Sequence, residues 1–225
     1  MLREEYLAVK AKELEYAKEV EANIKADKRP AIKYKESRPI TDIKHMIETS
    51  AELYADHVAF YEKKKKGQPY EPITYKEMLS QMNALGTALI DLGLKDKRIA
   101  IIGANSSKWA LSYLATVCGT GVVVPLDKEL PASTLEDLIK QSDATAVIFD
   151  QKYEDIFDEI KKKDENKLSV LINMHAEEDT ECALSWNGLL EKGQKLLDDG
   201  DRRFLDAQII RDVMSILLFT SGTTG

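Results

Sequence analysis

The chain has 225 residues, of which 44% are hydrophobic and 32% are charged, a balance typical of a soluble globular protein. Its formal net charge of −7 disfavours nucleic acid as a partner, although local geometry and a metal ion can still accommodate a polyphosphate. Two cysteines, Cys118 and Cys182, are too few for a disulfide framework or a zinc site, so we expect a cytoplasmic location.

The first segment predicts a charged helix over residues 3–27, without the apolar core of a signal peptide. Arg29 and Pro30 end this helix. We therefore assign residues 1–28 to an N-terminal helical extension and residues 29–225 to the main domain. Two alternatives stay open for the helix, which either docks on the domain or a neighbouring subunit, as in a homodimer, or extends freely into solvent.

Two further elements precede the main domain's sheet. A second helix is expected from about Thr41, followed by a β-hairpin over residues 57–75, HVAFYEKKKKGQPYEPITY. Alternating apolar residues flank its lysine-rich turn, which contains Gly67. The lysines at 63–66 allow a peripheral membrane contact, but the overall acidity favours the alternative of a solvated loop.

From residue 74 onward, apolar strands alternate with amphipathic helices. Thr74 and Glu77 have capping-box spacing, and the helix that they begin should end at Gly93. The further helices are expected at residues 107–119, 133–141, 153–162 and 186–197. The strands are expected at residues 98–103, 122–125, 144–149, 168–172 and 215–219. This pattern predicts an α/β fold with a mostly parallel sheet covered by helices on both faces.

The last predicted strand runs directly into the loop TSGTTG, beyond the carboxyl end of a strand, where such sheets bind ligands. Glycines let a ligand approach the main chain, and successive N–H groups in such a turn bind anions. Hydroxyls donate to phosphate oxygens or reach the water shell of a metal. The candidate residues are Thr220, Ser221, Gly222, Thr223, Thr224 and Gly225. They suit a polyphosphate, but their composition alone equally allows an ordinary turn.

Two common nucleotide-binding motifs are absent from the sequence. The terminal loop lacks the lysine of G-x-x-x-x-G-K-[ST], and GANSSKW at 103–109 lacks the G-x-G-x-x-G fingerprint, which argues against a nicotinamide or flavin cofactor.

The other conspicuous side chains are expected to have structural roles. Asp127 is expected to cap a helix or a turn, and Cys118 is expected to lie in the core. His45, His57 and His175 are scattered and lack the spacing of metal ligands. Trp109 and Trp186 are expected to lie in the core.

Three motifs occur in the order seen in the adenylate-forming enzymes, which include acyl-CoA synthetases, peptide-synthetase adenylation domains and firefly luciferase. LLFTSGTTG at 217–225 resembles their phosphate-loop signature. ITYKEML at 73–79 and CGTGVVVPLD at 118–127 resemble two of their earlier elements. The resemblance covers about residues 41–225, and the run at 86–131 is most similar to bacterial long-chain fatty acyl-CoA synthetases.

This resemblance implies the N-terminal part of an acyl-CoA synthetase-like fold and ATP-dependent activation of a carboxylic acid. It implies ATP and Mg²⁺ as cofactors and a fatty acid and coenzyme A as substrates. The loop at 220–225 would hold the β- and γ-phosphates, with the Thr220 hydroxyl near Mg²⁺. No catalytic residue can be transferred, because the family's adenine pocket, acidic metal ligand and catalytic lysine belong to later segments.

The family signature continues past this loop with a Pro-Lys-Gly segment that the chain does not include. We therefore expect an incomplete ligase, without activity of its own and with weak nucleotide binding. The alternatives within the superfamily are an aryl- or short-chain acid–CoA ligase and a peptide-synthetase adenylation domain. From another class, a non-catalytic binding or regulatory module would keep the fold without the chemistry.

Overall fold

The computed structural model describes residues 18, 39–63, 67–163, 165–210 and 212–220. Of the expected helix at residues 3–27 only Lys18 is described, so the extension at 1–28 and its boundary with 29–225 stay predictions. The turn lysines at 64–66 also lie outside the described residues.

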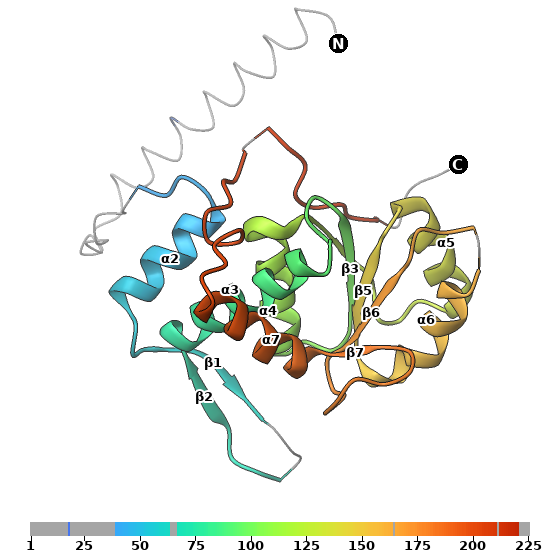
Figure 1. The fold of residues 1–225 in the computed structure, drawn as a ribbon, viewed down its shortest axis with the longest axis horizontal. Coiled ribbons are helices and arrows are strands. Elements are labelled where there is room, and N and C mark those ends of the chain that lie inside the picture. Colours follow the sequence, from blue (N-terminus) through green and yellow to red (C-terminus); the bar gives the residue numbers. More distant parts are fainter. Residues whose placement is uncertain (1–17, 19–38, 64–66, 164, 211, 221–225) are drawn as a thin grey trace, which may run out of the picture. The chain divides into compact units, whose positions relative to one another are not determined.

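A parallel sheet forms the centre of the unit that begins at Ile40 (Figure 1). Within the described residues it has five strands in the order β4-β3-β5-β6-β7, and every neighbouring pair is parallel. The strands are β3 (Arg98–Ile102), β4 (Val122–Pro125), β5 (Ala146–Phe149), β6 (Val170–Asn173) and β7 (Leu184–Ser185). The expected parallel sheet is therefore confirmed, and the two-residue β7 is an addition to it.

Helices cover both faces of the sheet, as the sequence predicts (Figure 1). One face is covered by α3 (Tyr75–Asp91), α4 (Ser107–Ala115) and α7 (Trp186–Asp198), and α2 (Ile43–Leu53) packs onto α3. The other face packs against α5 (Ala132–Ser142) and α6 (Glu154–Lys161), with a 3₁₀ turn at Gln151–Tyr153 before α6. Because strand side chains alternate, Ile99 and Ile101 enter the first core and Ala100 and Ile102 the second.

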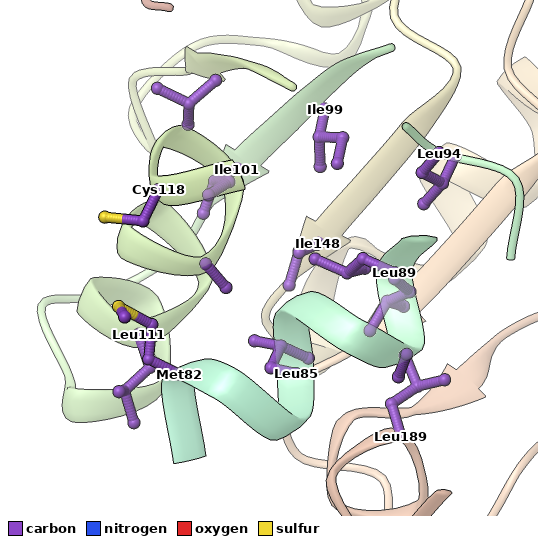
Figure 2. Close-up of a cluster of buried hydrophobic side chains, with 14 of the residues drawn as sticks. Met82, Leu85, Leu89, Leu94, Ile99, Ile101, Leu111, Cys118, Ile148 and Leu189 are labelled. Atoms are coloured by element: carbon purple, nitrogen blue, oxygen red, sulfur yellow. The ribbon is translucent and has the colours of Figure 1, made fainter. Parts of the chain in front are cut away.

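The first core is centred on α3, whose apolar stripe meets the sheet (Figure 2). Met82, Leu85 and Leu89 are fully buried in this core, where Met82 lies beside Leu111 of α4. Complete burial of a side chain of this size contributes about 1.5–3 kcal/mol. The predicted capping box begins the helix, since the Glu77 N–H donates to Thr74 Oγ1 at 3.2 Å and the Thr74 N–H donates to Glu77 Oε2 at 2.8 Å.

The predicted β-hairpin is also confirmed, as a second, antiparallel sheet of β1 (Val58–Glu62) and β2 (Glu71–Thr74). The helix expected from about Thr41 is α2, and the Asp42 carboxylate caps it by accepting the His45 N–H at 2.9 Å.

The helix expected at residues 107–119 needs a correction. The α-helix ends at Ala115 and continues as a π-helical turn at Thr116–Thr120. Gly119 adopts a φ of 155° in this turn, a conformation that favours glycine. The Thr120 hydroxyl donates to the Ala115 carbonyl at 2.9 Å and so adds a side-chain hydrogen bond across this turn.

The strand expected at residues 215–219 is wrong in extent, because only an isolated parallel bridge joins Ile216 to Val123 of β4. The Val123 N–H donates to the Ser215 carbonyl at 3.0 Å, and the Leu217 N–H donates to the Val123 carbonyl at 2.9 Å. The next donor on this side of β4 would be the N–H of residue 125, which is a proline. The ladder therefore stops after one residue.

Candidate functional site

Thr220 lies on the carboxyl side of the parallel sheet. The bridge at Ile216 is parallel, so the chain runs in the direction of the strands and reaches Thr220 four residues later. Leu217 and Phe219 pack against the second core, whereas Ile216 and Leu218 are 39% and 64% exposed. Thr220 is itself exposed, so its hydroxyl is accessible to a ligand.

The other predicted phosphate-binding residues lie outside the described residues, namely Ser221, Gly222, Thr223, Thr224 and Gly225. Their role stays a prediction, as does the Mg²⁺ contact of Thr220. The hydroxyl of Thr220 fits that ion chemically, because Mg²⁺ prefers oxygen ligands and commonly takes one or two from the protein, with phosphates and waters supplying the rest. Within the described residues, no group of three or more His, Cys, Asp and Glu side chains could hold a metal.

A second polar group lies at the same edge of the sheet, where β3 and β5 end. Asp150, directly after β5, accepts the Ala104 N–H at 2.7 Å through Oδ2, and its Oδ1 lies 3.0 Å from His175 Nε2. Gly103 makes room for this carboxylate, because a Cβ there would lie 2.7 Å from Asp150 Oδ1. Because β3 has β4 on one side and β5 on the other, this is the topological switch point of the sheet.

The sequence pattern alone does not single out Asp150, and it gives the scattered His175 no functional role. The available signal was an acidic residue directly after a fully buried strand, at the end where α/β sheets bind ligands. The Asp150 side chain is 13% exposed and that of His175 is 54% exposed, so solvent reaches this pair mainly through the imidazole.

The neighbouring Asn173 has a structural role. Its buried side chain donates from Nδ2 to Gln151 Oε1 and to Glu154 Oε2, both at 2.6 Å, and its Oδ1 accepts the N–H groups of His175 and Ala176. All of its hydrogen-bonding capacity is used in this way. Asn173 therefore holds the loop after β6 and leaves no group for a ligand.

The structural roles expected for three other side chains are confirmed. Asp127 caps its turn by accepting the Glu129 N–H at 2.9 Å. Burial raises the pKa of the Cys118 thiol to about 12, so this cysteine is an inert core residue and not a nucleophile. Trp186 is 2% exposed and donates its indole N–H to Ser112 Oγ at 2.9 Å.

Comparison with known proteins then decides the family. Residues 47–225 match the profile of the AMP-binding enzyme family, and the match includes the whole terminal loop. The chain belongs to the AMP-binding enzyme family. It thereby joins the adenylate-forming enzymes that its three motifs resemble.

Two curated relatives show how far the similarity extends. Long-chain-fatty-acid–CoA ligase 5 of Rattus norvegicus is 30% identical over 178 residues, which cover 72% of this chain and 25% of the relative. The uncharacterized acyl–CoA ligase YtcI of Bacillus subtilis (strain 168) is 29% identical over 157 residues, covering 69% and 27%. The chain thus spans about a quarter of the length of these AMP-binding relatives.

Solved structures share the fold of this AMP-binding domain. The anthranilate CoA ligase AuaEII in complex with anthranoyl-AMP aligns with a TM-score of 0.67 at 20% identity, over 81% of this chain and 32% of that one. A long-chain-fatty-acid-CoA ligase (FadD1) from Archaeoglobus fulgidus aligns with a TM-score of 0.63 at 16% identity, over 84% and 37%. None of the helices described here has the length and apolar character needed to cross a membrane.

Proposed function

We propose that this AMP-binding domain belongs to an ATP-dependent carboxylic acid–CoA ligase and that its terminal loop binds the β- and γ-phosphates of ATP. The family match, which extends through the loop at 220–225, carries the proposal. The position of Thr220 supports it, because ligands of parallel α/β sheets bind beyond the carboxyl ends of the strands.

In the proposed reaction, a carboxylate oxygen attacks the α-phosphorus of ATP, the bond to the bridging oxygen breaks, and pyrophosphate leaves. The thiol of coenzyme A then attacks the acyl carbon, displaces AMP and forms the thioester. The loop's hydroxyls and N–H groups would hold the leaving pyrophosphate and stabilise its negative charge. Mg²⁺, when bound near Thr220, would supply further charge neutralisation.

A long-chain fatty acid is the substrate that we favour. The supporting observation is the similarity to the rat long-chain-fatty-acid–CoA ligase over 72% of this chain. In a full-length ligase that contains this domain, we expect ATP–pyrophosphate exchange to be faster with palmitate than with acetate or benzoate. The reverse order would reject the long-chain assignment and leave acid activation in place.

Thioester formation should require more than the 225 residues, because the chain spans about a quarter of its relatives. We expect no thioester when the purified chain is mixed with palmitate, ATP, Mg²⁺ and coenzyme A. Detection of palmitoyl-CoA by mass spectrometry would contradict this expectation.

Nucleotide titration of the chain itself tests the phosphate loop. We expect ATP and pyrophosphate, each with Mg²⁺, to bind weakly, with dissociation constants above the micromolar range, and AMP to bind more weakly than either. Thr220→Val removes one hydroxyl hydrogen bond and should weaken ATP binding about threefold to tenfold.

A matched control is Ser133→Ala, which removes an exposed hydroxyl from α5. This variant should bind ATP as the original chain does. Equal binding of AMP and ATP, or identical ATP affinities for Thr220→Val and the original chain, would reject the loop as a site for the β- and γ-phosphates.

A further inference from the structure

Lys44 is a buried cation that joins α2 to a segment 160 residues away along the chain. Lys44 is only 5% exposed. Its ammonium donates to the carbonyls of Phe204, Leu205 and Ala207 at 2.9, 2.8 and 2.9 Å. An ammonium has three N–H donors, so all of them are used. The same ammonium lies 5.4 Å from the centre of the Phe204 ring, a cation–π contact.

Two opposing effects act on the charged form of Lys44. Burial lowers the pKa of the ammonium, whereas the carboxylates of Glu48, Asp206 and Asp42 oppose this effect. Three backbone carbonyls add their negative ends at hydrogen-bonding distance. The ammonium thus gives all three carbonyls a charged donor, and the Phe204 carbonyl also accepts the Ala207 N–H at 3.2 Å.

The segment held by Lys44 leads to the predicted phosphate loop. We call residues 204–210 and 212–220 the strap. Phe204 anchors its first part, being fully buried and so close to α3 that a Cβ on Gly86 would lie 2.2 Å from its ring. Its second anchor is the bridge at Ile216, and between the two anchors Ile210 and Val213 are 65% and 62% exposed.

We propose that Lys44 is a positioning residue, whose ammonium fixes the strap on α2 and thereby sets where the phosphate loop begins at Thr220. The role in positioning the phosphate loop rests on the proposed function, whereas the anchoring of the strap by Lys44 does not depend on it. The middle of the strap has few core contacts, so its path depends on the anchors at either end. Loss of the Lys44 contact would leave the buried Phe204 ring and the bridge at Ile216 as the remaining anchors of the strap.

Hydrogen exchange of the purified chain, without nucleotide, tests this inference. In Lys44→Ala, the amides of Ala207 and Leu217, which donate to Phe204 and Val123, should exchange about tenfold faster or more, because a lost hydrogen bond to a charged group shifts a local opening equilibrium by that amount. Amides of β3 and β5 should keep their protection.

Two comparisons separate positioning by charge from simple packing. First, n-propylammonium replaces the atoms that Lys44→Ala removes and should restore protection of the strap, whereas the neutral n-propanol should not. Second, Lys44→Arg retains the positive charge and should keep the strap better protected than the neutral Lys44→Gln, which should resemble Lys44→Ala.

Lys108→Ala is the matched control. The Lys108 ammonium is also partly buried, but it donates to the Met174 carbonyl at 2.7 Å and to Asn187 Oδ1 at 3.0 Å, away from the strap. Its removal should accelerate exchange near Met174 and leave Ala207 and Leu217 unchanged.

Unchanged strap exchange in Lys44→Gln would overturn the inference, and so would an equal acceleration across β3, β5 and the strap, which marks global destabilisation. If Lys44→Ala does not fold, the comparison of Lys44→Arg with Lys44→Gln decides the outcome. Because no nucleotide is present, a failure of this inference is distinguishable from a failure of ATP binding.

Discussion

Gly193 is the residue on which the contact between α3 and α7 depends. A Cβ at this position would lie 1.8 Å from the Ala84 carbonyl oxygen, which belongs to the backbone of α3 and cannot rotate away. Gly193→Ala should therefore force the two helices apart and lower the free energy of unfolding by about 3 kcal/mol, at the upper end of overpacking effects. Urea denaturation measures this change.

Gly188→Ala is the control on the same helix. The nearest atom to a Cβ there, Ser185 Cβ, is 3.6 Å away, an ordinary contact distance. Gly188 lies in the first turn of α7, where alanine is at least as favourable as glycine, so this variant should be as stable as the original chain or slightly more stable. Similar losses for both variants would show that the close approach at Gly193 has no special cost.

Cys118 supplies a prediction about pH. Burial raises its pKa from 9.0 to about 12, so the folded chain keeps the proton while the unfolded chain releases it above about pH 9. The contribution of Cys118 to stability should be constant below pH 9 and fall as the pH rises from there toward 12. Cys118→Ala should remove this part of the alkaline decline in urea denaturation curves, and an unchanged decline would contradict the assignment.

At the scale of elements, the start of α3 shows how directly a local pattern can specify structure. Both hydrogen bonds of the capping box form between residues three positions apart, so no distant contact is needed to predict them. Thr74→Ala should lower the free energy of unfolding by about 1 kcal/mol, whereas Thr74→Ser, which keeps the hydroxyl, should lose much less. Equal losses would mean that the Thr74 methyl group, and not the cap, stabilises the helix.

The free energy of unfolding at acidic pH should depend on the same helix cap. Hydrogen bonds from the Thr74 N–H and hydroxyl lower the pKa of the Glu77 carboxyl below its ordinary value of 4.5. A lowered pKa stabilises the folded state above pH 4.5, and this contribution is lost as the pH falls through the lowered value. The stability difference between the original chain and Glu77→Ala should therefore shrink below pH 4.5, and a constant difference would argue against the cap.

Elements that depend on distant partners were harder to predict. The apolar run at 215–219 has the composition of a strand, but its pairing depends on β4, where Pro125 cannot donate. Likewise, the apolar pattern of 107–119 predicts one helix, whereas the chain widens to a π-helical turn at Thr116 before it enters β4. The limit at 215–219 depends on a pairing partner about 90 residues away, which the local sequence does not show.

At the scale of the whole molecule, periodicity predicted the parallel sheet and the helices on both of its faces, because each face of the sheet needs an apolar cover. The sequence pattern predicts only part of the candidate site. The motif at 220–225 could be read directly, whereas the contacts of Asp150 with His175 and of Lys44 with the strap join residues far apart in sequence. Only the fold brings these side chains together.

The most direct test of the phosphate loop is to map the ATP contacts on the isotopically labelled chain by amide NMR with Mg²⁺ present. We expect the largest shifts at residues 220–225, and we expect Thr220→Val to reduce them and AMP to leave these amides nearly unchanged. Shifts centred instead on Gly103 and Asp150, with residues 220–225 unaffected, would contradict the assignment and move the nucleotide to the switch point of the sheet.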